Sequence, residues 1–250
     1  MISKRIIPCL DVKDGQVVKG INFVSLQHAG SAVELAGRYY NEGADEIVFL
    51  DITASIEKRK TLLELVKEVA KEIRIPFTVG GGISELNDIE LLLRSGADKV
   101  SLNSSIVNNP SLITDAARRF GSQAIVAAID VKNINDKKKV FINGGKIETE
   151  LEGLSWCKKV NELGAGEILL TSMDHDGTKN GYDLDFLNQV TESVTIPVIA
   201  SGGAGEEKHF LDVFRIGIDA CLAASLFHYK ELAITDLKQY LHSNGIAVRL

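Results

Sequence analysis

The sequence predicts an α/β fold, a (β/α)8 barrel built from two repeated (β/α)4 halves. Its 250 residues match the usual length of such a barrel. Short apolar segments alternate eight times with amphipathic segments, as expected when parallel strands are joined by helices. The second half also repeats the first at an offset of 121 residues, so that Ile75 corresponds to Ile196.

Eight apolar segments are the expected strands. Most of them are continuously apolar, which is typical of parallel strands covered on both faces. Between them, helical spacing of apolar residues is clear at 62–70, 86–95 and 210–216. The strands are expected at 5–12, 46–52, 76–80, 99–103, 124–130, 167–172, 197–201 and 220–225.

The repeat decides between a closed barrel and an open doubly wound sheet. Residues 75–82 correspond to 196–203, and residues 96–98 correspond to 217–219. Two equal halves close naturally into a TIM barrel, whereas an open sheet would need different edge strands. We therefore expect one domain spanning residues 1–250.

Two segments interrupt the alternation, at 14–27 and 133–149. Each follows the carboxyl end of a strand, where barrel active sites are built. We interpret both as loops that could close over a ligand, with ordinary surface loops as the alternative.

Composition excludes several classes of protein. Hydrophobic residues make up 45% and charged residues 25%, which is a globular rather than a disordered mixture. The net charge of −6 argues against nucleic-acid binding. No signal or membrane segment is visible, and Cys9, Cys157 and Cys221 are too far apart for a disulfide or zinc framework. We expect a cytoplasmic protein with no metal and no cofactor.

Polar residues at the carboxyl ends of the strands are the catalytic candidates. Asp11 and Asp130 end the first and fifth strands and correspond in the repeat. Two carboxylates across one pocket suit general acid–base catalysis. The alternative, that each aspartate caps a turn, does not require a matched pair. Asp51, Thr171 and Ser201 end further strands and are expected in the same pocket.

Glycine-rich segments after four strands predict two phosphate sites. Gly80–Gly82 and Asn103–Ser105 follow the third and fourth strands, and Gly202–Gly203 and Ala224–Ser225 are their counterparts. Glycine lets backbone N–H groups approach a phosphate closely. Simple turns are the alternative for any one segment. The duplicated pair instead predicts a substrate with a phosphate at each end.

Charged residues begin four strands at the opposite end. Arg5, Glu46, Lys99 and Glu167 could form a salt-bridged ring, and a structural plug or solvated strand starts are the alternatives. The expected inward residues above them are small or apolar, which suits passage of a neutral molecule. These residues are Cys9, Val48, Leu50, Val126, Ala128 and Leu169.

The motifs at 4–12, 49–55, 78–83, 171–179 and 200–205 resemble the cyclase subunit of imidazole glycerol phosphate synthase, over residues 1–250. The resemblance implies a lyase of histidine biosynthesis that forms a heterodimer with a glutaminase. Ammonia from that glutaminase would react with a bisphosphorylated ribulosyl formimino-aminoimidazole carboxamide nucleotide. The products would be imidazole glycerol phosphate and aminoimidazole carboxamide ribotide.

The resemblance also implies a role for each matching residue. Asp11 and Asp130 would be the acid–base pair, and Lys19 would close on the substrate. One phosphate would bind Gly82, Asn103 and Ser104, and the other would bind Asp176, Gly177, Gly203, Ala224 and Ser225. Arg5, Glu46, Lys99 and Glu167 would form the ammonia gate, with Asp98 at the partner interface.

The sequence departs from the family pattern at two positions. His175 stands where the family usually has Arg, and Ser104 where Thr is usual. Two other functions remain open. One is the sister sugar isomerase of the same pathway, and the other is a non-catalytic scaffold that activates an amidotransferase.

Overall fold

The chain folds as an α/β barrel of eight parallel strands surrounded by helices, which confirms the predicted fold class. The computed structural model describes residues 3–13, 16–21, 24–51 and 56–250. The parallel strands are β1 (Arg5–Lys13), β4 (Ile47–Asp51), β5 (Phe77–Gly80), β6 (Lys99–Leu102), β7 (Ile125–Ile134), β10 (Glu167–Ser172), β11 (Val198–Ser201) and β12 (Ala220–Ala223).

The chain divides into two compact units. Unit 1 comprises Met1–Val100 with Ala223–Leu250, and unit 2 comprises Ser101–Leu222. Both boundaries fall inside strands, β6 and β12, which are equivalent in the sequence repeat. Each unit therefore corresponds approximately to one half of the sequence repeat.

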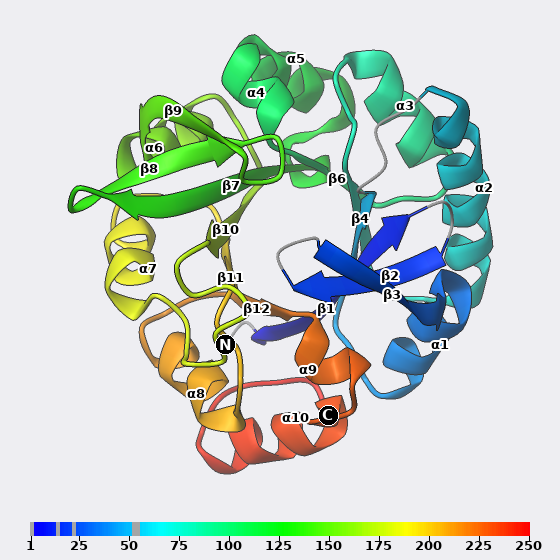
Figure 1. Cartoon of the computed structure of the whole chain (residues 1–250), viewed down its shortest axis with the longest axis vertical. Helices are drawn as coiled ribbons and strands as arrows, with labels where there is room; N and C mark the ends of the chain where they lie inside the picture. Colours follow the sequence, from blue (N-terminus) through cyan, green and yellow to red (C-terminus); the bar gives the residue numbers. More distant parts are fainter. Residues whose placement is uncertain (1–2, 14–15, 22–23, 52–55) are drawn as a thin grey trace. The chain divides into compact units, whose positions relative to one another are not determined.

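In unit 1, β4 lies in parallel between β1 and β5. Helices α1, α2 and α3 lie on the outer side of these strands in Figure 1. Phe49 and Phe77 pack edge to face between β4 and β5, with ring centroids 5.2 Å apart. The helices of this unit are α1 (Ala32–Asn41), α2 (Ile56–Glu72), α3 (Leu86–Arg94), α9 (Ser225–His228) and α10 (Ile234–Ser243).

In unit 2, β10 pairs in parallel with β7 on one side and β11 on the other, and β11 pairs with β12. Helices α6, α7 and α8 cover the outer side of these strands (Figure 1). Its helices are α4 (Ser104–Asn108), α5 (Ser111–Phe120), a short 3-10 turn (Ser122–Ala124), α6 (Gly153–Glu162), α7 (Leu184–Thr191) and α8 (Glu207–Arg215).

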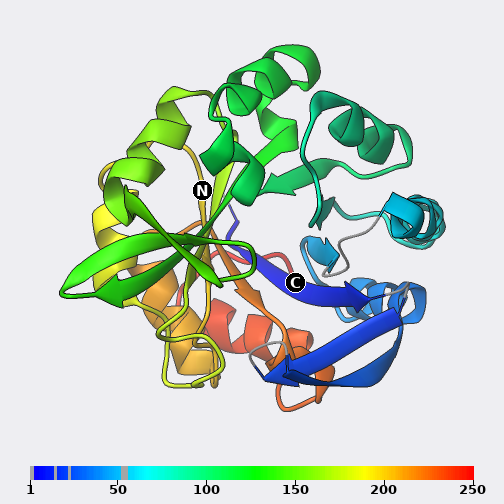
Figure 2. The same ribbon diagram turned by 45° about the horizontal axis from the view of Figure 1, so that its top comes forward.

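The two segments interpreted as loops contain antiparallel strands, so that interpretation was wrong. In unit 1, β2 (Gln16–Ile21) pairs with both β1 and β3 (Val24–Ser31). In unit 2, β7 runs on to Ile134 and pairs with β8 (Lys137–Ile142), which pairs with β9 (Ile147–Glu152). Figure 2 shows both sets of paired arrows, blue in unit 1 and green in unit 2. Alternation of apolar with polar residues marks β9 (IETELE), but β2 (QVVKGI) and β8 (KKKVFI) show neither regular alternation nor a continuous apolar segment.

The same aspartate contact recurs in both units. The Asp98 carboxylate accepts a hydrogen bond from the backbone N–H of Phe77 (3.0 Å), and Asp219 accepts one from Val198 (3.1 Å). These pairs are separated by the repeat offset. In each, the side chain satisfies an N–H at the start of the preceding strand, which the parallel ladder leaves without a partner.

Helix α10 is held to unit 1 by a buried lysine. Lys238 is 2% exposed, and its ammonium lies 2.7 Å from the Asp45 carboxylate. It also donates to the Gly43 carbonyl oxygen, while Arg249 lies 3.3 Å from Asp45. Burial lowers the pKa of Lys238, and the Asp45 carboxylate opposes that shift. Across the ranges that the structure describes, no helix has the length and apolar character to cross a membrane.

Candidate functional site

Three of the predicted pocket residues form one row in unit 2. The register of the parallel strands places Asp130 of β7 beside Thr171 of β10, and Thr171 beside Ser201 of β11. Residues in register on neighbouring strands point to the same face of the sheet. Asp130, Thr171 and Ser201 therefore share one face of the sheet. Thr171 and Ser201 lie at or next to the carboxyl ends of β10 and β11, as expected, whereas β7 continues beyond Asp130 to Ile134.

Asp130 is a carboxyl group with a shifted pKa. Its pKa is raised from 3.8 to about 6, mainly by burial and to a smaller extent by the Asp176 carboxylate. The Thr171 hydroxyl and the Asn103 amide act in the opposite direction because they donate hydrogen bonds to the charged form. The Asn103 Nδ2 atom lies 3.0 Å from Asp130 Oδ2. This carboxyl group can therefore gain or lose a proton near neutral pH.

The residues predicted for one phosphate lie beside Asp130. Asn103 follows β6 and immediately precedes α4, which begins at Ser104. The Ser104 hydroxyl donates to Asn103 Oδ1 (3.3 Å) and accepts a hydrogen bond from the backbone N–H of Asn143 (2.9 Å). The turn between β8 and β9 therefore reaches this segment. The sequence analysis did not identify Asn143, because nothing in its local pattern indicates a contact 39 residues away.

Three of the residues predicted for the other phosphate, Asp176, Gly177 and Gly203, lie in unit 2, where two segments pack together. The backbone N–H of Gly181 donates to the Gly203 carbonyl (2.8 Å). Gly203 has φ +110°, and a Cβ there would lie 2.0 Å from the Gly181 carbonyl oxygen. Only glycine fits such a position. Gly177 is also at positive φ, +73°, but a Cβ there would meet nothing within 4 Å. The Cα of Gly177 therefore borders an open space, while the neighbouring backbone N–H groups of Asp176 and Thr178 donate to the carbonyl oxygens of Ser172 and His175.

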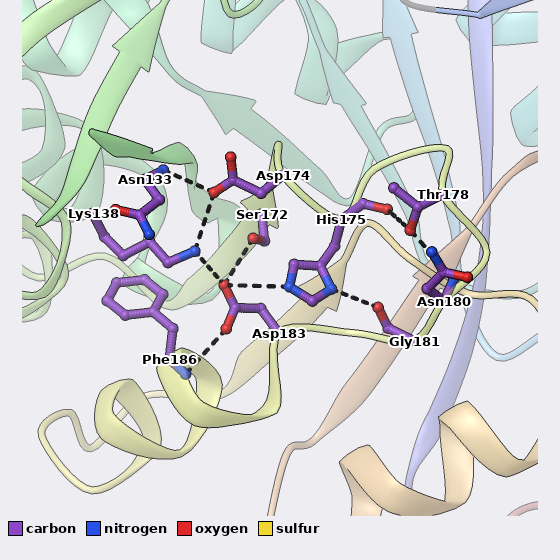
Figure 3. A network of polar contacts seen from close by, with 10 residues as sticks. All are labelled: Asn133, Lys138, Ser172, Asp174, His175, Thr178, Asn180, Gly181, Asp183 and Phe186. Carbon is purple, nitrogen blue, oxygen red and sulfur yellow. Dashed lines mark hydrogen bonds and ion pairs between the residues drawn. The ribbon is translucent and has the colours of Figure 1, made fainter. Parts of the chain in front are cut away.

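A polar network surrounds this second segment (Figure 3). The Lys138 ammonium lies 2.6 Å from Asp183 and 3.2 Å from Asp174, and Ser172 donates to Asp183 (2.9 Å). His175, the departure from the family pattern, contacts the Gly181 carbonyl through Nδ1 (2.8 Å). Lys138 belongs to the charged run 136–139, for which the residue types alone indicate solvated side chains, but its own side chain is only 19% exposed. Its place within a strand, opposite Asn133 in the register, turns it toward the network.

Unit 1 carries the other predicted residues of this end. Asp11 is in register with Leu50, whereas Asp51 is in register with Val12. Asp11 and Asp51 therefore point to opposite faces of the sheet. Lys19 lies in β2, and the position of its side chain is outside the described part of the structure. Gly82 follows β5, and Ala224 and Ser225 stand at the start of α9.

Three of the four predicted charged residues at the opposite strand ends meet in unit 1. Glu46 is 1% exposed and accepts hydrogen bonds from Arg5 (2.7 Å), Lys99 (2.9 and 3.1 Å) and Thr78 (2.7 Å). The Arg5 guanidinium and the Lys99 ammonium both bind the Glu46 carboxylate, so these three charged side chains form one compact cluster. Glu167, which corresponds to Glu46 in the repeat, is 5% exposed in unit 2.

Other reactive groups have ordinary structural environments. Cys9, Cys157 and Cys221 are buried, and burial raises the pKa of the Cys157 thiol to about 12. A thiol of that pKa is a poor nucleophile at neutral pH. In the described ranges, no group of three or more His, Cys, Asp or Glu side chains is arranged to hold a metal ion.

Comparison with known proteins identifies the family. The model of a family described as "Histidine biosynthesis protein" matches residues 5–233. Proteins named "Imidazole glycerol phosphate synthase subunit HisF" from Wolinella succinogenes and Flavobacterium johnsoniae are each 59% identical over 251 residues. These matches cover 100% of this chain and 99% and 100% of the two relatives. The counterpart from Clostridium botulinum is 58% identical over 253 residues, with full coverage of both chains. The chain therefore belongs to the histidine biosynthesis family and, within it, to the HisF cyclase subunits of imidazole glycerol phosphate synthase, which are lyase-type enzymes.

Proposed function

We propose that this chain uses ammonia to convert the bisphosphorylated ribulosyl formimino-aminoimidazole carboxamide nucleotide into imidazole glycerol phosphate and aminoimidazole carboxamide ribotide. The observation that carries the proposal is Asp130, a partly buried carboxyl whose pKa is raised to about 6 and which lies in register with Thr171. The names of its full-length relatives support the same assignment.

Asp11 and Asp130 are the proposed acid–base pair. The ring closure and the release of the second product both require proton transfers, and a carboxyl with a pKa near neutral pH can serve in either direction. Asn103 and Thr171 hold the Asp130 carboxylate in place by hydrogen bonds. Lys19, Thr171 and Ser201 complete the proposed pocket. Asp51, which was expected there, is left out because its register with Val12 turns it to the face of the sheet opposite to that of Asp11.

Two groups of residues are proposed to bind the phosphates. One consists of Gly82, Asn103 and Ser104, and the other of Asp176, Gly177, Gly203, Ala224 and Ser225. Support comes from the open space next to Gly177 and from the close packing at Gly203, which fixes the neighbouring backbone. Backbone N–H groups bind phosphate without a basic surface, which is compatible with a net charge of −6.

The partner is proposed to be a glutaminase that forms a heterodimer with this chain. The relatives are named as subunits, which supports an assembly of more than one chain. Ammonia would enter at Arg5, Glu46, Lys99 and Glu167, with Asp98 at the interface. We further propose that the two units form a single domain and that the protein is cytoplasmic.

The direct test is turnover of the bisphosphorylated nucleotide by the purified chain with ammonium salts as the nitrogen source. Asp11→Asn and Asp130→Asn are expected to abolish turnover while leaving the fold unchanged. Full activity in either variant would refute the acid–base assignment. Isomerisation of the pathway's aminoaldose precursor without ammonia would instead favour the sister isomerase. Glutaminase activation without any turnover would favour the scaffold.

A further inference from the structure

The β8–β9 hairpin of unit 2 contacts Ser104 of one proposed phosphate site and the two ends of the segment that contains Asp176 and Gly177 of the other. At its turn, the backbone N–H of Asn143 donates to the Ser104 hydroxyl (2.9 Å). Five residues earlier, the Lys138 ammonium binds Asp183 (2.6 Å) and Asp174 (3.2 Å). The sequence analysis assigned this hairpin only a possible lid function, and nothing in the proposed mechanism uses Lys138.

Lys138 is neutralised by protein carboxylates. Its side chain is 19% exposed, that of Asp183 is 10% exposed, and the Phe186 ring centroid lies 6.0 Å from the ammonium. Burial alone would lower the pKa of Lys138, but its hydrogen bonds to Asp183 and Asp174 reverse the shift and raise it. The lysine is therefore charged at neutral pH, and Figure 3 shows its ammonium turned toward the two carboxylates.

The two carboxylates lie at the two ends of one segment. Asp174 begins it and accepts a hydrogen bond from the Asn133 backbone N–H (2.7 Å). Asp183 ends it, where it caps α7 by accepting from Phe186 and also accepts from Ser172 (2.9 Å). The segment between them, 175–182, contains Asp176 and Gly177. One ammonium therefore ties both ends of the proposed phosphate-binding segment to a strand outside it.

We propose that Lys138 is a positioning residue for the phosphate site at Asp176, Gly177 and Gly203. This inference rests on the proposed function, since it assumes that a phosphate binds there. By holding Asp174 and Asp183 together, Lys138 fixes the backbone of the segment, and with it the position of Gly177 beside the open space. Loss of the ammonium leaves two neighbouring carboxylates uncompensated, so they repel each other and also repel an incoming phosphate dianion.

Inorganic phosphate is the probe, and its binding is followed by the amide NMR signals of Gly177 and Gly203 in the full chain. Lys138→Met is expected to weaken binding at these amides about tenfold, the order of loss that follows a small displacement of binding groups. Lys138→Arg is expected to restore most of it. Lys139→Met is the matched control on the same strand, because Lys139 donates to the Glu150 carbonyl (3.0 Å) instead. It should leave phosphate affinity unchanged.

Three readouts separate positioning from direct binding and from general damage. In the Asp183→Asn background, the effect of Lys138→Met should shrink, whereas a lysine that itself contacts phosphate would keep its full effect. The Ser104 amide should report unchanged phosphate binding in Lys138→Met. In turnover assays, KM for the nucleotide should rise more than kcat falls. Lys138→Gln, which keeps a hydrogen-bond donor, replaces the Met variant if the latter does not fold.

The outcomes distinguish this inference from the proposed function. If the wild-type chain binds phosphate at Gly177 and Gly203 and Lys138→Met binds it equally well, Lys138 has no positioning role and the proposed site stands. If the wild-type chain shows no phosphate binding at these amides, the proposed phosphate site is wrong and the role of Lys138 is refuted with it.

Discussion

The hydrogen bond between Thr171 and Asp130 gives the most specific test of the proposed chemistry. Thr171→Val replaces the hydroxyl with a methyl group of similar size, so packing between β7 and β10 is nearly unchanged. The variant removes one donor to the charged form of Asp130, and the Asn103 donor at 3.0 Å remains. Burial, the largest influence on this carboxyl, also remains. The pKa of Asp130 is therefore expected to rise.

The size of the rise follows from the strength of the lost bond. A hydrogen bond to a charged group contributes about 1.5–3 kcal/mol. Because about 1.4 kcal/mol corresponds to one pKa unit, the pKa of Asp130 should rise by about one to two units. Starting from about 6, it reaches between about 7 and 8. At pH 7 the ionised fraction then falls from about nine-tenths to between about one-half and one-tenth.

The assay is a carbon NMR titration of the Asp130 carboxyl, recorded beside the pH profile of kcat/KM with ammonia. The limb of the profile that titrates with Asp130 should move upward with the NMR value. Ser201→Ala is the matched control, because Ser201 occupies the same row on β11, one strand further from Asp130. It should change the pKa of Asp130 by no more than a few tenths. An unchanged or lowered pKa in Thr171→Val would refute the electrostatic account of this site.

Three further predictions concern stability, measured as the free energy of unfolding in urea. Because the folded-state pKa of Asp130 is raised from 3.8 to about 6, the folded state retains a proton that the unfolded state loses in this window. The contribution of Asp130 to stability should therefore fall by about 2 kcal/mol as pH rises from 4 to 7, and Asp130→Asn should lack this component; parallel pH profiles of the two proteins would contradict it. Glu46→Ala leaves the partly buried cations of Arg5 and Lys99 without their carboxylate and should lower the free energy of unfolding by about 3 kcal/mol. Thr78→Val, which removes one hydrogen bond to Glu46, should lower it by about 1 kcal/mol. Equal losses in the two variants would mean that the ion pairs do not stabilise the fold. Gly203→Ala places a Cβ 2.0 Å from the Gly181 carbonyl oxygen and should lower the free energy of unfolding by about 3–5 kcal/mol. Gly177→Ala meets no neighbour and should lower it by only about 1–2 kcal/mol, because of its positive φ. A larger loss in Gly177→Ala than in Gly203→Ala would refute the close packing at Gly203.

The sequence predicted the strands and part of the site because each depends on short-range regularity. Continuous apolar segments located all eight parallel strands, and their carboxyl ends then supplied Asp130, Thr171 and Ser201. The row that these residues form follows from strand register alone. The alternation of side chains along a strand does not by itself show which face Asp51 occupies. Its register with Val12 places it on the face opposite to that of Asp11.

The residues that were missed act through contacts between distant segments. Lys138 lies in a run of three lysines, and only its pairing opposite Asn133 selects it over Lys137 and Lys139 to face Asp174. Asn143 contributes a backbone N–H, which every residue except proline possesses. Neither position carries a local signal, because the choice of partner is made by strand pairing and not by residue type.

Comparison of the two halves separates scaffold from specialisation. Where the barrel geometry requires a contact, both halves keep it, as at Asp98 and Asp219. Position 45 and its counterpart 166 show the opposite case. Asp45 binds Lys238 of α10, whereas Gly166 approaches the chain so closely that a Cβ would lie 2.1 Å from the Ser122 carbonyl oxygen. The backbone of Ser122 therefore leaves no room for a side chain at position 166, whereas the Asp45 side chain binds Lys238 and so anchors α10. The repeat predicts the framework, and the features that distinguish one half from the other are found only where the repeat fails.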